Sequence, residues 1–432
     1  MLLLENIFSK KFFYTFLIIF LLKCSYLLIF GQTVEIDSYG YAECTLHFEY
    51  PPTYPYFLYF LRSVYASLFF VAIVQVFLFS VCASLFTNYF FAGKKSLLAA
   101  ILLGIEPVTS LFCSNIMSEC MFISVLMLWI ILVYDFFAES KKSFLKVFLI
   151  GVLAGILYSV RFAGILFLFF FIVMILANKE KRKYFLSSIV ILFISFHLII
   201  LPVRIKYKMV FDTYFFNGFT GELLWNNASA IYLQSGVRKN PETDFEKFVA
   251  QTDTANFTIE KAITGRQLWE PDLAYRSYML EKQYGFNDLP KASTEAGNTA
   301  LKIIRESPFS YFKMYVLPSF FQAFLTAPKM EMQKYAAYFS ETYHTASLRT
   351  PFYSAFYWIF YFSLLSICTL LYIIKKMKNI FCKTIFQLSW LYIIILPFIS
   401  IPESRHYLIL APLILFAAIL QLQSFYKAKL ND

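Results

Sequence analysis

Long apolar runs are the feature that most constrains the fold of this 432-residue chain. A helix needs about 20 apolar residues to cross the hydrocarbon core of a bilayer. Because 59% of the residues are hydrophobic and only 15% are charged, lipid must be the main solvent of the protein. We therefore predict an all-α polytopic membrane protein with about ten transmembrane helices. The predicted spans are 12–30, 67–91, 96–113, 117–137, 145–160, 162–177, 185–203, 352–374, 382–401 and 406–424.

Basic residues predict the orientation of these spans, because short loops rich in Lys and Arg stay in the cytoplasm. Alternate connections carry the basic residues, whereas the loop over 31–66 holds four acidic residues and the single Arg62. The pattern places both termini in the cytoplasm. The basic connections are marked by Lys10 and Lys11, Lys94 and Lys95, Lys141 and Lys142, Lys179 to Lys183, Lys375 to Lys378, and Lys427 and Lys429.

Three parts of the chain follow from this topology. Residues 1–204 form an N-terminal transmembrane module whose first external loop is 31–66, and residues 351–432 form a C-terminal module. Between spans seven and eight, the polar segment 205–350 is a mixed external domain, periplasmic or lumenal. Its short apolar stretch over 312–325 is predicted to be an interfacial or re-entrant helix. We expect a multi-pass protein of a bacterial inner or plasma membrane, or of the endoplasmic reticulum if the host is eukaryotic.

Charge and cysteine content argue against two other kinds of protein. The net charge of +11 could suggest a nucleic-acid binder, but the basic residues lie in short runs between apolar segments. The seven cysteines form no CxxC pair and no Cys/His cluster, so neither a zinc site nor a disulfide framework is predicted. We therefore expect no nucleic-acid partner and no structural metal.

Ionisable residues near membrane depth are the main functional clue, because each must face protein, water or substrate. On the predicted topology, six of them lie at the non-cytoplasmic ends of spans, although they come from distant parts of the sequence. Carboxylates beside guanidinium groups would form an acid/base site that also binds phosphate. For any single residue, a helix-end ion pair is the plain alternative. The six residues are Asp37, Glu119, Arg161, Arg204, Glu403 and Arg405.

Five ordered segments resemble the polyprenyl-phosphate-sugar-dependent glycosyltransferases of the GT-C superfamily, such as protein O-mannosyltransferases and the aminoarabinose transferases that modify lipid A. The first-loop segment has an Asp followed by Tyr and a Pro-rich stretch, and the last has Arg and Tyr followed by Pro. Phe162 stands where many relatives have Pro, and His406 separates Arg405 from Tyr407, which leaves the sugar and the acceptor open. The segments are DSYGYAECTLHFEYPPTYPYF (37–57), EPVTSLFCSNIMSECMF (106–122), YSVRFAGILF (158–167), LPVRIKYKMVFDTYFFNGFTGELLW (201–225) and ESRHYLILAPLILFAAI (403–419).

The resemblance implies a reaction at the non-cytoplasmic face. A polyprenyl-phosphate-linked sugar donor would enter from the membrane lipid, and an acceptor hydroxyl of a lipid, glycan or protein would attack the anomeric carbon in one inverting displacement. Asp37 would be the catalytic base. No metal is assigned, although a divalent cation at Glu119 and Asp37 is left open because no ligand spacing demands one. The implied substrate-binding residues are Tyr39, Glu119, Arg161, Arg204, Glu403, Arg405 and Tyr407.

Two other functions remain alternatives. A multi-span transporter or lipid flippase would place charge near the midplane on broken helices, and Glu106-Pro107 within the third predicted span favours it. A non-catalytic assembly factor for surface polysaccharide would need no base, so it would tolerate neutralisation of Asp37.

The topology predicts that a cysteine introduced near residue 240 reacts with a membrane-impermeant thiol reagent added from the non-cytoplasmic side. Labelling of intact cells, with a lysed sample as the control for reactivity, measures this. Reaction only from the cytoplasmic side would contradict both the topology and the location of the proposed site.

Overall fold

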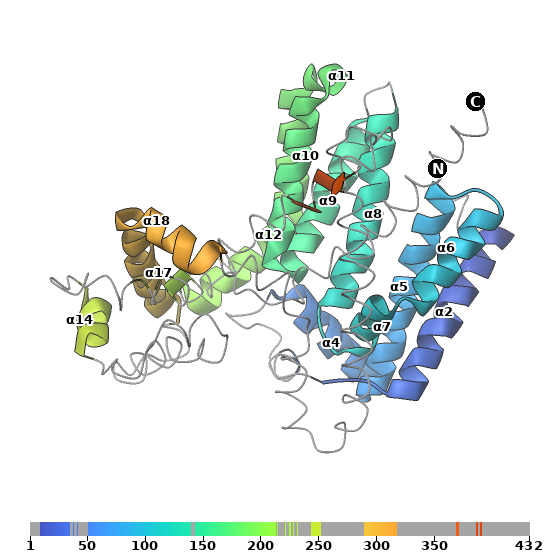
Figure 1. The fold of residues 1–432 in the computed structure, drawn as a ribbon, viewed down its shortest axis with the longest axis horizontal. Helices are drawn as coiled ribbons and strands as arrows, with labels where there is room; N and C mark the ends of the chain where they lie inside the picture. The colour runs from blue at the N-terminus through green and yellow to red at the C-terminus, as the bar shows by residue number, and fades with distance from the viewer. Residues whose placement is uncertain are drawn as a thin grey trace. The chain divides into compact units, whose positions relative to one another are not determined.

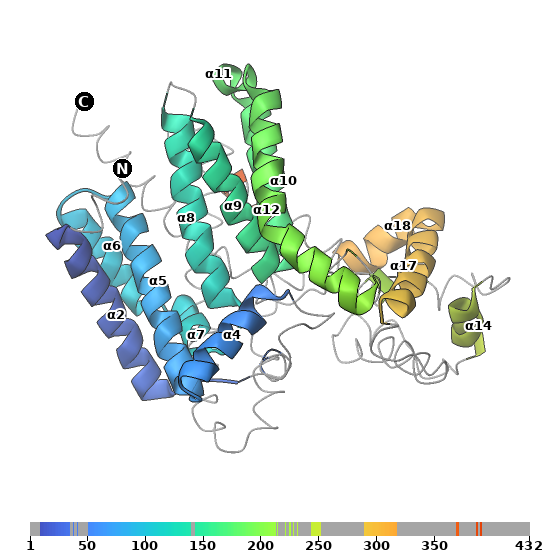
Figure 2. The same ribbon diagram turned by 180° about the vertical axis from the view of Figure 1, so that it is seen from behind.

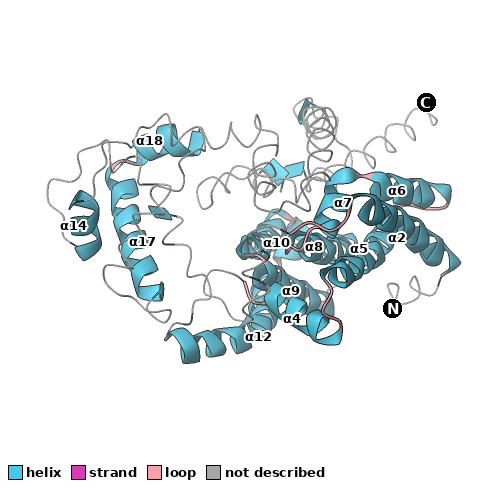
Figure 3. Ribbon diagram, turned by 90° about the horizontal axis from the view of Figure 1, so that it is seen from below, coloured by secondary structure: helices cyan, strands magenta, loops and turns pink. Residues whose placement is uncertain are grey.

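The computed structural model describes residues 9–34, 38, 41, 51–139, 143–212, 214, 221, 224–225, 228, 231, 243–251, 289–317, 369–370, 386–387 and 389–390. All of the regular secondary structure in these residues is helical, as Figure 3 shows, and the only β pairing among them is an isolated bridge between Thr33 and Asn115. The chain divides into two compact units, one built mainly from Met1–Pro202 and one mainly from Val203–Thr326. The predicted spans over 352–374, 382–401 and 406–424 lie almost entirely outside the described residues.

Each of the first seven predicted apolar runs is helical (Figure 1). Four helices are long and apolar enough to cross a membrane, namely α2, α5, α8 and α12, and the bent pair α6–α7 makes a fifth. The described helices therefore support a multi-pass membrane protein. The helices of this region are α2 (Lys10–Phe30), α4 (Thr53–Val64), α5 (Leu68–Phe90), α6 (Lys94–Ile105), α7 (Pro107–Ser114), α8 (Glu119–Ala138), α9 (Phe144–Val160), α10 (Ile165–Ala177), α11 (Lys179–Arg182) and α12 (Phe185–Phe211).

Two of the predicted spans have different limits in the structure. The run over 96–113 is two helices, because the chain bends by 61° between α6 and the part of α7 after Pro107. The run over 185–203 continues as one helix to Phe211, although its apolar composition ends earlier. Backbone hydrogen bonds, not hydropathy, decide where a helix ends, so α12 extends beyond the membrane-compatible part of its sequence.

Polar side chains cap several helices where the apolar runs begin. The Ser9 hydroxyl accepts a hydrogen bond from the backbone N–H of Phe12 at the start of α2. Ser143 accepts in the same way from Lys146 at the start of α9. Such caps satisfy backbone donors that the first helical turn cannot pair, which matters most where water is scarce.

Several helices of the first unit pack side by side, including pairs that are not consecutive in the chain. Figure 2 shows α2 lying along α5 and α6, while α5 packs on α8 and α8 on α9. Gly151 and Gly155 of α9 lie close to the backbone of α12. A Cβ atom added at Gly155 would lie 3.0 Å from the carbonyl oxygen of Phe196 and 2.9 Å from the Cβ of Ile199. This small-xxx-small spacing lets two helices pack closely without a hydrophobic driving force between them.

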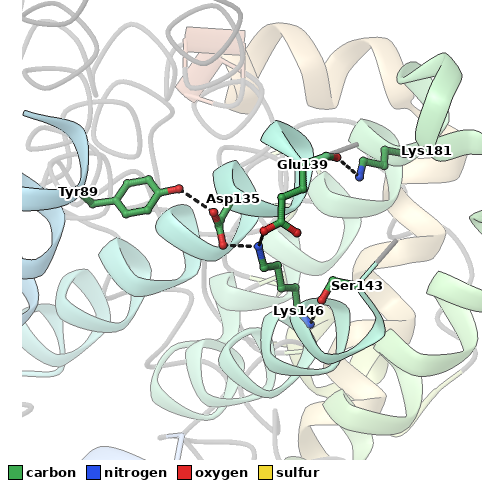
Figure 4. Close-up of polar contacts among 6 residues, drawn as sticks. All are labelled: Tyr89, Asp135, Glu139, Ser143, Lys146 and Lys181. Carbon is green, nitrogen blue, oxygen red and sulfur yellow. Dashed lines mark hydrogen bonds and ion pairs between the residues drawn. The ribbon is translucent and has the colours of Figure 1, made fainter. Parts of the chain in front are cut away.

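A polar cluster joins α5, α8, α9 and α11 at one end of the bundle (Figure 4). The Tyr89 hydroxyl donates to Asp135 Oδ1 at 3.0 Å, and Lys146 forms ion pairs with both Asp135 and Glu139. The buried Lys181 donates its Nζ to the backbone oxygen of Glu139 at 2.6 Å and lies over the ring of Phe136. Burial lowers the pKa of Lys181, and the nearby Glu139 carboxylate opposes this shift.

The same end of the bundle holds the start of α2. Lys11 Nζ donates to the backbone oxygen of Phe91, one residue after the end of α5, at 2.8 Å. Contacts of Lys11, Tyr89, Lys146 and Lys181 therefore join the described helix ends from α2 to α11. This arrangement is the one expected of helices that alternate in direction.

The second unit has its own apolar core. Within it lie α14 (Asp244–Gln251), α17 (Leu289–Glu306), α18 (Pro308–Tyr311) and a π-helix over Phe312–Val316. One face of α17 carries small residues, so Trp225 and Phe245 can pack beneath it with their rings edge to face at 4.9 Å. The core consists of Trp225, Ala228, Ile231, Phe245, Ala292, Ala296, Ala300, Ile303, Tyr311 and Val316.

Replacing Gly155 by Val is expected to separate α9 from α12, because the added atoms overlap backbone that cannot rotate away. Overpacking of this kind costs roughly 1–3 kcal/mol. Thermal unfolding of the purified protein in detergent should show a lower midpoint than for the wild type. Leu149→Val on the more exposed side of α9 is the matched control, and an equal midpoint for the two variants would contradict close packing at Gly155.

Candidate functional site

A buried ion pair links the start of α8 to the end of α9. Glu119, the first residue of α8, is 1% exposed, and its Oε1 lies 2.6 Å from Nη1 of Arg161. The same Nη1 donates to the Ser118 hydroxyl at 3.1 Å. Arg161 follows the last residue of α9 with an extended backbone, so its side chain leaves the helix axis and reaches across to α8. In apolar surroundings, removal of one partner of such a pair costs about 3–5 kcal/mol.

The first loop is bound to the turn that leads into Glu119. Thr33 exchanges backbone hydrogen bonds with this turn, donating to Ser114 O and accepting from Ile116 N, both at 3.0 Å. Further along the loop, the Ser38 hydroxyl donates to Ile116 O at 2.8 Å. Residues about eighty positions apart in sequence are thus joined beside the α8 N-terminus.

Gln75 of α5 anchors the same turn from the other side. Its side-chain amide donates to the backbone oxygens of Cys113 and Asn115 at 3.0 and 2.8 Å, and its Oε1 accepts from the buried Tyr54 hydroxyl at 2.5 Å. Tyr54 belongs to α4, the helix of the first loop. Both the amide nitrogen and the amide oxygen of Gln75, a polar residue in the middle of an apolar helix, are therefore hydrogen-bonded.

Helix α4 also contacts α9 directly. The Thr53 hydroxyl donates to the Ser159 hydroxyl at 2.7 Å, two residues before Arg161. The first loop, the α7–α8 turn and the end of α9 consequently meet at the N-terminal end of α8. The polar cluster that contains Lys146 lies at the other end of the same helix.

The structure brings together two of the predicted site residues, Glu119 and Arg161. Arg204 is half-buried in the part of α12 that belongs to the second unit. The predicted convergence of the three arginines on one phosphate therefore remains a prediction. The predicted residues Asp37, Tyr39, Glu403, Arg405 and Tyr407 lie outside the described residues.

A second buried cluster was not predicted from the sequence. Lys23 of α2 is 1% exposed, and its Nζ donates to the backbone oxygen of Glu106 at 2.8 Å and to the hydroxyls of Thr109 and Ser110, each at 2.7 Å. Its ammonium group also lies over the ring of Phe79. A single Lys inside an otherwise apolar predicted span was the signal that could have identified it.

Glu106 explains the bend between α6 and α7. Its carboxylate accepts hydrogen bonds from the backbone N–H groups of Val108 and Thr109 at 2.6 and 2.7 Å, and so caps α7. A negative charge at a helix N-terminus is favourable, and Pro107 fits the first helical position. At this bend, Lys23 pairs with the backbone oxygen of Glu106, and the Glu106 carboxylate pairs with the first backbone N–H groups of α7.

Metal ligands do not gather in the part of the chain that the structure describes, where no group of three His, Cys, Asp or Glu residues could hold an ion. Cys113 and Cys120, which flank the turn before α8, are buried with their Sγ atoms 3.5 Å apart. With Asp37 outside the described residues, a cation between Asp37 and Glu119 stays an open expectation.

Replacing Lys23 by Met should destabilise the protein by about 1–3 kcal/mol, because the buried backbone oxygen of Glu106 and the hydroxyls of Thr109 and Ser110 lose their shared donor. The Lys23 ammonium also attracts the nearby Glu106 carboxylate, so adding Glu106→Gln should restore part of this loss. Denaturant unfolding of the two single variants and the double variant measures the coupling, and exposed Lys10→Met is the control. Purely additive losses would show that Lys23 and Glu106 do not stabilise each other.

Searches of family models, curated proteins and solved structures find no match for this chain. The likeness to the GT-C glycosyltransferases accordingly rests on the ordered sequence segments alone. Function is therefore argued from those segments and from the contacts that the described residues make.

Proposed function

We propose that this protein is a membrane glycosyltransferase that transfers a sugar from a polyprenyl-phosphate donor to an acceptor hydroxyl. One observation carries the proposal. Three segments that resemble the family, 37–57, 106–122 and 158–167, are linked by hydrogen bonds and an ion pair at the same end of the bundle. Helices can pack together without polar contacts between these three segments. Polar contacts between the same segments that resemble the family therefore support the proposal.

The reaction assigns a different task to each polar group. The acceptor oxygen attacks the anomeric carbon, the bond from that carbon to the phosphate oxygen breaks, and polyprenyl phosphate leaves with both electrons of the bond. Asp37, which directly precedes Ser38, takes the proton of the acceptor hydroxyl. Inversion follows because a single displacement reverses the configuration of the attacked carbon.

Arg161 is suited to receive the charge that develops on the leaving phosphate. A guanidinium group presents several donors in a plane and matches phosphate oxygens. The contact with Glu119 would hold that plane in a fixed orientation, so Glu119 acts as a positioning residue. Arg204 and Arg405 are the further candidates for phosphate contacts, and Tyr39, Glu403 and Tyr407 for contacts with the sugar.

Transport of a lipid or solute is the second candidate function. The observation that favours it is the 61° break between α6 and α7, where Glu106 and the buried Lys23 lie within predicted spans. Broken helices with charged groups at membrane depth are typical of transporters. A lipid-scrambling assay in vesicles distinguishes the two functions, since the glycosyltransferase does not need to move the donor across the bilayer.

Asp37→Asn should reduce glycosyl transfer by about 10²–10⁴-fold, because it removes basicity while keeping the size of the side chain. The measurement is transfer from a polyprenyl-phosphate sugar by purified proteins at matched concentration. Glu35→Gln, two residues earlier in the same loop, is the control and should retain activity.

Near-normal transfer by Asp37→Asn would contradict the assignment of the base. A cap of a short helix would then be the role left for Asp37, with a local effect of about 1 kcal/mol. The search for the base would move to Glu119 and Glu403. A protein that shows no transfer in either form but supports polysaccharide assembly in cells would instead be the non-catalytic factor.

A further inference from the structure

The segment over 308–317 in the second unit has two chemically distinct faces. Tyr311 and Val316 are 4% and 3% exposed and belong to the apolar core of the unit. On the other side, Phe309, Phe312 and Leu317 are 75%, 44% and 39% exposed. Large apolar side chains thus lie on the surface of a unit whose core is already filled from the opposite side.

Four of the exposed residues of this segment are together called the stripe, namely Phe309, Phe312, Lys313 and Leu317. Lys313 is basic, and no acidic residue occurs in 308–317. Aromatic side chains beside a basic group are typical of segments that lie in the interface between lipid headgroups and acyl chains.

The second unit is also continuous with a membrane helix. Residues Val203 to Phe211 of α12 belong to this unit, whereas the earlier part of the same helix is apolar enough to cross a bilayer. Ile205 and Met209, on the part within the second unit, are exposed as well. The second unit is therefore continuous in sequence with a helix that is long and apolar enough to cross a bilayer.

We propose that the stripe formed by Phe309, Phe312, Lys313 and Leu317 inserts into the headgroup and acyl-chain boundary of the protein's own membrane. The apolar side chains enter the acyl region, and Lys313 stays with the anionic phosphate groups of the lipids. This docking does not depend on the reaction proposed above.

The test uses the full-length protein in nanodiscs that contain anionic phospholipid and a phospholipid with a photoreactive diazirine on its acyl chain. After illumination, mass spectrometry of peptides locates the lipid adducts. We expect adducts on Phe309, Phe312 and Leu317 but not on Tyr311 or Val316. The exposed Ile194 of α12 serves as the internal reference for labelling.

A double variant, Phe309→Ser with Phe312→Ser, should lower labelling of 308–317 by at least about tenfold relative to Ile194, because each buried Phe favours the apolar phase by roughly that factor. Leu301→Ser, an exposed leucine of α17 outside the stripe, should leave it unchanged. Equal adducts on both faces would indicate a crossing segment. Absence of adducts on the stripe, while Ile194 is labelled, would show that lipid does not reach it. Either result overturns the proposal.

Discussion

An ionisable group surrounded by lipid must find its partner within the protein, and this requirement governs much of the described structure. Lys23 meets it with a carbonyl and two hydroxyl groups, and Arg161 meets it with Glu119. Both contacts join helices that are distant in sequence. They therefore restrict how the apolar helices pack, a restriction that uniform apolar surfaces could not supply.

The backbone obeys the same requirement at the places where helices end. Glu106 caps α7 inside the bundle, and Gln75 pairs with the two carbonyl groups that the α7–α8 turn leaves without helical partners. These hydrogen bonds pair polar backbone groups around the turn with protein atoms instead of water. Glu119 begins the helix that follows this turn. The geometry of the proposed phosphate site therefore depends on residues far from it.

Hydropathy predicted the seven helical runs of the N-terminal module, since apolar length is a local property of the sequence. Hydropathy alone did not mark the break within the third run, where Glu106 and Pro107 begin a second helix, because it does not recognise an N-cap within an apolar stretch. It also missed Lys23, whose importance depends on α7 being packed beside α2. In the second unit the helical segment begins at Pro308, four residues before the predicted start at 312, because Pro favours a first helical turn that the apolar composition does not mark.

The candidate site was predictable only in part. Glu119 and Arg161 were selected because the predicted topology gave them the same depth, and the structure shows that they touch. Their pairing could not be derived from the sequence, because it depends on the side-by-side packing of α8 and α9. Topology and the resemblance both selected Asp37, which lies outside the described residues, and the neighbouring Ser38 hydroxyl donates to Ile116 O in the turn before α8.

The most direct measurement of the central claim is a comparison of lipid-linked sugars and surface glycans, by mass spectrometry, in host cells with and without the protein. A glycosyltransferase that uses a polyprenyl-phosphate sugar predicts that its donor accumulates and that one glycan modification disappears when the protein is absent. The same donor pool and the same glycans in both cells would contradict the account.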